Sequence, residues 1–162
     1  MTIMSDEPIS SDPSGKSPPK AAFWLGYAGL IPFAVCALAI VVFRQDLFLQ
    51  ETAGKALLAY GAVILSFLGG AHWGRALYAP NTSLQTRDFV LSVLPSIFGW
   101  SCLLLPIISA GVLLLILGYI WQVYVDLNGM RQNILPHWFG RLRVQLTAGA
   151  TLFLLIGGAA LL

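Results

Sequence analysis

Charged residues are scarce in this chain. Only 10% of its 162 residues are Asp, Glu, Lys or Arg and 57% are hydrophobic, whereas an average soluble domain carries about 25% charged residues. The net charge of +2 is too small to indicate nucleic-acid binding. Both cysteines, Cys36 and Cys102, lie in apolar runs and predict no disulfide framework. The composition therefore predicts a protein that is solvated by the lipid bilayer.

The motifs that identify most catalytic and cofactor sites are missing as well. The sequence contains no Gly-x-Ser-x-Gly elbow, phosphate-binding loop, His-Glu-x-x-His helix or paired acidic dyad. His72 and His137 have no Cys or His neighbours at a spacing suited to zinc, and His137 follows Pro136 in a connection, which disfavours paired haem ligation. We therefore expect no metal, no cofactor and no catalytic residue, and the balance favours a protein that is not an enzyme.

Long uncharged runs set the number of membrane spans. About 20 apolar residues cross a ~30 Å hydrocarbon core, so the uncharged runs 21–43, 56–74 and 144–162 each hold one span. The run 89–125 is too long for one helix and must fold back, for which Pro106–Gly111 is suited. The sequence predicts an all-α, polytopic membrane bundle of about five transmembrane helices in one domain, 21–162, after a disordered polar tail, 1–20. The predicted spans are 21–43, 56–78, 89–106, 110–126 and 143–162.

Lys and Arg are divided unevenly between the two sides of such a bundle. Seven lie on the side of the N-terminus, and only Arg44 and Lys55 lie on the other. Cytoplasmic connections are enriched in Lys and Arg, so the N-terminus is predicted to be cytoplasmic and the C-terminus outside.

Small residues recur every four positions in the second span, at Ala62, Ser66, Gly70 and Gly74. Helices in lipid associate through close backbone approach, because hydrophobic burial gives little drive between them. We interpret this stripe as a helix-packing face that makes the second span the central helix. Packing within the bundle is favoured over homodimerisation through the same face.

Two ionisable residues near the ends of spans are candidate functional residues. His72 lies within the second span, beside Trp73 and one turn from Arg75, and is either a neutral imidazole bonded to a neighbouring helix or a group that handles a proton or substrate. Asp126 ends the fourth span, where a negative charge opposes the helix dipole, so a cationic partner is expected. The candidate partners are Arg75, Arg87, Arg131 and Arg143.

Pro32 and Pro95 interrupt the first and third spans, where each removes a backbone donor. Such kinks either shape the packing or line a binding site. The connection 126–143 mixes apolar residues with three arginines, a composition typical of a segment that lies on anionic lipid or docks a protein.

The chain resembles the bacterial and mitochondrial membrane proteins grouped with transmembrane protein 69, a family of unknown function. The resemblance rests on Leu25-Gly-Tyr-Ala-Gly-Leu-Ile-Pro32 and on Tyr60 through Gly74, above all Ser66-Phe-Leu-Gly-Gly-Ala-His-Trp-Gly74. Ser92-Val-Leu-Pro-Ser96, Leu135-Pro-His-Trp138 and Leu142-Arg143 add to it, and the match covers about residues 22–162. It implies a polytopic protein of the bacterial inner membrane and carries no activity, cofactor or catalytic residue.

Three functions fit these observations. The first is a non-catalytic accessory or assembly component of a membrane complex, with another membrane protein as its partner. The second is a small transporter or proton-linked permease that uses His72 and the kinked helices. The third is an intramembrane enzyme that acts on lipid or quinone. The pattern of residues identifies neither the substrate nor the oligomeric state.

Overall fold

The computed structural model describes residues 19–131 and 137–162, and the predicted tail, 1–20, falls almost wholly outside them. Within these ranges the chain forms helices joined by short connections and contains no strand. The helices are α1 (Lys20–Ala28), α2 (Ile31–Val42), α3 (Leu47–Ala76), α4 (Thr82–Leu103), α5 (Ile108–Arg131) and α6 (His137–Ala160). The all-α prediction is confirmed.

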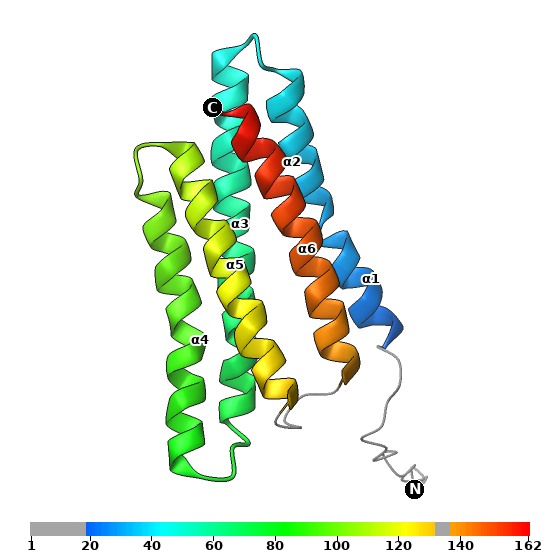
Figure 1. The fold of residues 1–162 in the computed structure, drawn as a ribbon, viewed down its shortest axis with the longest axis vertical. Helices are drawn as coiled ribbons and strands as arrows, with labels where there is room; N and C mark the ends of the chain where they lie inside the picture. Colours follow the sequence, from blue (N-terminus) through cyan, green and yellow to red (C-terminus); the bar gives the residue numbers. More distant parts are fainter. Residues whose placement is uncertain (1–18, 132–136) are drawn as a thin grey trace, which may run out of the picture.

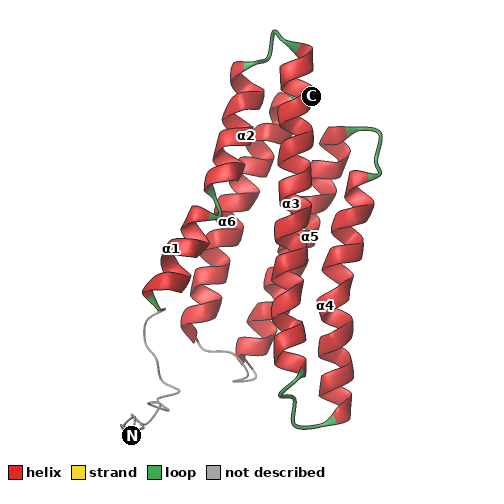
Figure 2. Ribbon diagram, turned by 180° about the vertical axis from the view of Figure 1, so that it is seen from behind, coloured by secondary structure: helices red, strands yellow, loops and turns green. Residues whose placement is uncertain are grey.

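The helices form five roughly antiparallel rods, because α1 and α2 continue one another (Figure 1). The N-terminal end of α1 and the connection between α3 and α4 lie at one end of the bundle. The connections from α2 to α3 and from α4 to α5 lie at the other, as does the C-terminus (Figures 1 and 2). The chain turns between α4 and α5 at residues 104–107, which overlaps the turn predicted at Pro106–Gly111.

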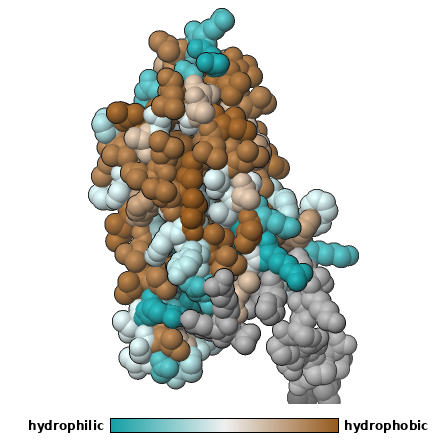
Figure 3. Space-filling view, in the orientation of Figure 1, coloured by the Kyte–Doolittle hydropathy of each residue, from teal (hydrophilic) through white to brown (hydrophobic). Residues whose placement is uncertain are grey.

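Four helical segments in the described part are long and apolar enough to cross a membrane: Lys20–Val42, Leu47–Ala76, Ile108–Met130 and Trp138–Ala160. Helix α4 is not among them, because its first turns carry several polar residues, including Arg87 and Asp88. It nevertheless runs alongside α3 and α5 over most of its length (Figure 1). Figure 3 shows a brown, apolar surface over the middle of the bundle, with teal residues gathered toward its ends.

Helices α3 and α4 begin earlier than the predicted spans, because capping side chains start them outside the apolar runs. The carboxylate of Asp46 accepts a hydrogen bond from Leu49 N at 3.1 Å, and the Asn81 side chain accepts one from Leu84 N at 2.9 Å. Helix α3 then carries an exposed Glu51–Lys55 ion pair of 2.6 Å before its apolar part begins. At 30 residues, α3 is roughly 45 Å long and exceeds the hydrocarbon core.

Helix α3 is the central helix, as predicted, and packs against α2, α4, α5 and α6. Close approach is possible because Gly61 and Gly69 have no Cβ. A Cβ added at Gly61 would lie 2.8 Å from Leu115 on α5, and one added at Gly69 would lie 2.6 Å from the Ser92 carbonyl oxygen on α4. The core around it contains aromatic and aliphatic side chains from α2, α3, α5 and α6, among them Phe33, Leu65, Tyr119 and Leu154.

The prediction that 126–143 is a surface connection is wrong for most of its length. Helix α5 continues past Asp126 to Arg131, and α6 begins at His137. Charge marked the end of the apolar run, but a helix extends past the first charged residue when that charge finds a partner in the bundle. The remaining residues, 132–136, lie outside the described part of the chain.

Candidate functional site

Four polar side chains from three helices meet inside the bundle. His72 on α3, Gln122 and Asp126 on α5 and Arg143 on α6 are each no more than 8% exposed. His72 Nε2 lies 2.9 Å from the Gln122 amide nitrogen and 3.1 Å from Asp126 Oδ1. We call these four residues the buried polar cluster. Ionisable groups inside a membrane protein are costly to bury, which makes the cluster the leading candidate functional site.

The two contacts of His72 constrain its protonation. If Nε2 carries the proton, it donates to the Asp126 carboxylate, and Gln122 must present its oxygen to the same N–H. If Nε2 is bare, it accepts from the Gln122 amide, and Asp126 must be protonated to avoid repulsion between two acceptors. Both arrangements place one proton between His72 and Asp126. His72 Nδ1 is buried without a hydrogen-bond partner among the described residues.

Asp126 finds its cationic partner in Arg143, one of the four arginines considered from the sequence. Arg143 Nε lies 3.2 Å from Asp126 Oδ2, and an Arg143 terminal nitrogen donates to the Leu68 carbonyl at 3.3 Å. The Nε–Oδ2 pair is close but not aligned as a hydrogen bond, so the attraction is mainly electrostatic. When His72 is neutral and Asp126 is ionised, the charges of Asp126 and Arg143 cancel and the cluster carries no net charge, which suits a low-dielectric interior.

A second ion-paired cluster joins α3 to α4 near the connection between them. Arg75 donates two hydrogen bonds to the Asp88 carboxylate, at 2.7 and 2.6 Å, in the forked geometry that guanidinium and carboxylate favour. Arg87 reaches the same carboxylate only at 3.4 Å, with 42% of its side chain exposed against 14% for Arg75. Arg75 therefore belongs to this cluster and not to the one around His72.

The predicted small-residue stripe divides between two environments. Ala62 is 4% exposed and packs in the core, and the Ser66 hydroxyl donates to the Ala62 carbonyl at 2.9 Å. Gly70 and Gly74 instead face outward, where an added Cβ would meet no described heavy atom within 4 Å. Bundle packing therefore uses Gly69, next to Gly70, and not the outer two positions of the stripe.

The two prolines occupy different kinds of position. Pro32 lies in the first turn of α2, where a backbone N–H would have no hydrogen-bond acceptor within the helix, so the lack of this N–H costs little. The break before it exposes the Gly29 carbonyl, which accepts a hydrogen bond from the Tyr60 hydroxyl at 2.9 Å. Pro95 is buried within α4 and packs where α4 crosses Gly69. Both positions favour a role in shaping the packing.

Trp73 lies on the outer surface and not beside the cluster. It is 51% exposed and makes an edge-to-face contact with Phe89 on α4, with ring centroids 4.8 Å apart. The two rings border an apolar hollow of about 400 Å³, lined by Trp73, Phe89, Val90, Val93 and Leu94. Trp73, Gly70 and Gly74 thus share the outward face of α3.

A family profile described as "Protein of unknown function (DUF3429)" matches residues 18–159. The chain belongs to this family. It is 38% identical to Transmembrane protein 69 of Xenopus tropicalis over 146 residues, which cover 88% of the chain and 54% of that protein. It is 32% identical to Transmembrane protein 69 of Mus musculus, over 78% of the chain and 50% of that protein. The chain therefore spans about half the length of these relatives, and no solved structure matches it.

Membership of this family confirms the resemblance seen in the sequence and supports a membrane protein. The profile covers both α3 and α6, so all four residues of the buried polar cluster lie within the matched range. The family description assigns no activity, so the chemistry of the cluster has to be argued from its geometry.

Two residues of these clusters were missed in the sequence. Gln122 is an amide within an otherwise apolar run, and that isolation was a signal of a buried hydrogen bond. Asp88 follows Arg87 and was treated only as the end of an uncharged run.

Among residues 19–131 and 137–162, no group of three or more His, Cys, Asp or Glu side chains is placed to hold a metal ion.

Proposed function

We propose that this family member is a non-catalytic accessory or assembly component of a membrane complex. It would lie in the bacterial inner membrane with its N-terminus in the cytoplasm and its C-terminus outside. The observation that supports this function best is the outward face of α3, where Gly70 and Gly74 lie one turn apart with no described atom near either. In lipid, paired small residues let the backbone of another helix approach closely.

The surroundings of these glycines support a docking role. The apolar hollow at Trp73, Phe89 and Val93 lies next to them and offers a recess for a large side chain of the partner. The ionic contacts of both clusters, by contrast, are made within the bundle, between α3 and α4 and among α3, α5 and α6. The charges therefore hold the component together, while its apolar outer face remains for the partner.

Affinity capture from native membranes tests this function. The N-terminally tagged protein, Gly70→Leu and Ala148→Leu are each purified in a mild detergent, and co-purifying proteins are quantified by mass spectrometry. Ala148 is exposed on α6 and serves as the matched control. We expect one membrane complex in stoichiometric amount with the wild type and the control, and its loss with Gly70→Leu. Recovery of the protein alone, or equal recovery with all three, contradicts the proposal.

A second candidate is proton-linked transport, which the His72–Asp126 contact favours. His72 Nε2 and Asp126 Oδ1 lie 3.1 Å apart inside the bundle, close enough for a proton to pass between them. Proteoliposomes that contain a pH-sensitive dye and a membrane potential provide the test. Transport predicts a protein-dependent proton flux that His72→Gln abolishes. A wild-type flux no greater than that of empty vesicles, or one that His72→Gln leaves intact, contradicts this function.

A further inference from the structure

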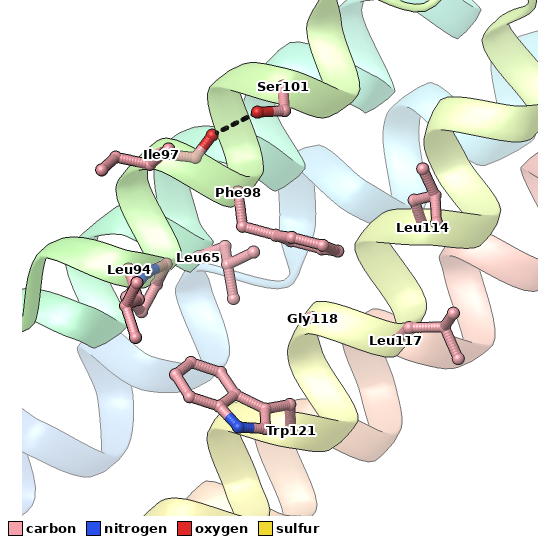
Figure 4. Close-up of a pocket in the computed structure, with 10 residues that line it drawn as sticks. Leu65, Leu94, Ile97, Phe98, Ser101, Leu114, Leu117, Gly118 and Trp121 are labelled. Atoms are coloured by element: carbon pink, nitrogen blue, oxygen red, sulfur yellow. Dashed lines mark hydrogen bonds between the residues drawn. The ribbon is translucent and has the colours of Figure 1, made fainter. Parts of the chain in front are cut away.

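Two cavities lie in sequence along the seam between α4 and α5. One, of about 190 Å³, is near the α3–α4 connection and is lined by Arg75, Arg87, Leu91, Val125, Asn128 and Gly129. The other, of about 520 Å³, is almost wholly apolar. Figure 4 shows it between Leu94 and Phe98 on one helix and Leu114, Leu117 and Trp121 on the other, with Leu65 of α3 behind.

Helical spacing indicates that the two cavities, which share no lining residue, continue one another as one groove. On α4 the lining includes a set at 87, 91, 94, 98 and 101, with 95 and 97 beside it, and on α5 a set at 114, 118, 121, 125 and 128, with 117 and 129 beside it. Both sets alternate in steps of three and four, so each forms a single stripe along its helix. Leu91 and Leu94 are one turn apart, as are Trp121 and Val125. From Arg87 to Ser101 the groove rises by roughly 21 Å, more than one ~15 Å leaflet of the hydrocarbon core.

The two ends of this groove differ in charge. At the polar end, two arginines face a single carboxylate, that of Asp88, which leaves an excess positive charge. Arg75 is among the residues that line the small cavity, and its Nη1 is buried without a hydrogen-bond partner in the described part of the chain. Arg87 is held to Asp88 only at 3.4 Å, so its guanidinium retains donors for another anion. Asn128 adds a neutral amide to the same cavity.

We propose that the α4–α5 groove binds one anionic phospholipid. Its phosphate would lie at Arg75, Arg87 and Asn128, because guanidinium groups bind phosphate through paired hydrogen bonds. An acyl chain would continue past Trp121 into the apolar cavity at Leu94, Phe98 and Leu117. A soluble phosphate would use only the polar end, and a partner helix would not use the excess charge. Because a basic cavity and an apolar cavity lie in the same groove, a lipid is favoured over both a soluble phosphate and a partner helix.

Brominated lipids test this site, because bromine on an acyl chain quenches tryptophan fluorescence on contact. The full chain is reconstituted in vesicles of phosphatidylcholine with a minor fraction of phosphatidylglycerol. Bromine is carried either by phosphatidylglycerol or by the same fraction of phosphatidylcholine, so the overall composition is unchanged. The Trp121 signal is the difference between the wild type and Trp121→Phe.

We expect brominated phosphatidylglycerol to quench Trp121 more strongly than brominated phosphatidylcholine does. Arg87→Gln should reduce this preference about fivefold, the effect of one basic residue near an anionic lipid. Arg141→Gln, which removes an exposed arginine of α6 outside the groove, should leave it unchanged. Equal quenching by the two lipids, no quenching of Trp121 by either, or equal losses in both arginine variants would overturn the proposal.

Discussion

His72 Nε2 and Asp126 Oδ1 lie 3.1 Å apart on α3 and α5, and each side chain is 2% exposed. The same carboxylate faces Arg143 of α6 through its second oxygen. Asp126 therefore joins three helices at one point, and the loss of its charge would leave the Arg143 guanidinium buried with only the Leu68 carbonyl and the Phe139 ring as described contacts. The consequences of this arrangement, and of three others, are measurable.

Neutralising Asp126 should destabilise the bundle strongly. Removal of one partner of a buried ion pair costs about 3–5 kcal/mol, because the other charge stays buried. We expect this loss of unfolding free energy for Asp126→Asn and for Arg143→Gln, measured by denaturant titration in detergent micelles. The double variant should lose clearly less than the sum of the two. Additive losses would show that the two residues do not depend on each other.

Arg75 and Arg87 should contribute unequally, although both contact Asp88. Arg75→Gln breaks a forked, largely buried pair and should cost about 3–5 kcal/mol. Arg87→Gln removes a longer and more exposed contact and should cost less than about 1 kcal/mol. Thermal unfolding of the purified variants gives the comparison. Equal shifts in midpoint would contradict the geometry of this cluster.

Neighbouring glycines of α3 should respond oppositely to a single methyl group. A Cβ at Gly69 would lie 2.6 Å from the Ser92 carbonyl oxygen and 2.9 Å from Pro95 Cγ, so Gly69→Ala should cost about 1–3 kcal/mol through overpacking. Gly70→Ala meets no described atom and should be neutral or stabilise α3 by up to about 1 kcal/mol. Comparison of the unfolding free energies of Gly69→Ala and Gly70→Ala with that of the wild type tests both expectations. A large loss at Gly70 in isolated protein would mean that its face is already occupied.

The proposed orientation predicts which connections are accessible from outside the cell. In a variant with Cys36 and Cys102 replaced by Ala, single cysteines are introduced as Gln45→Cys, between α2 and α3, and Ser83→Cys, near the start of α4. Both positions are exposed. A membrane-impermeant maleimide should label the first in intact cells and the second only after permeabilisation. The reverse pattern would invert the topology and with it the cytoplasmic assignment of both arginine-containing clusters.

The sequence by itself determined the class of fold and the approximate number of helices. Hydrocarbon requires uncharged runs of about 20 residues, and that requirement is visible residue by residue. It located the helices less well, because Asp46 and Asn81 cap α3 and α4 outside the uncharged runs. It also singled out His72, Asp126 and Arg143, since an ionisable residue next to an apolar run is conspicuous.

Only the tertiary structure decided which of these residues meet. Four arginines were compatible with Asp126 in the sequence, and the packing of α5 against α6 selects Arg143. Likewise, a four-residue repeat cannot say which side of α3 faces its neighbours, and the crossing of α4 at Gly69 leaves Gly70 outside. The physical reason is the same in both cases. The bilayer acts on each segment separately, whereas pairing and close approach depend on the rotation and height of two helices relative to each other.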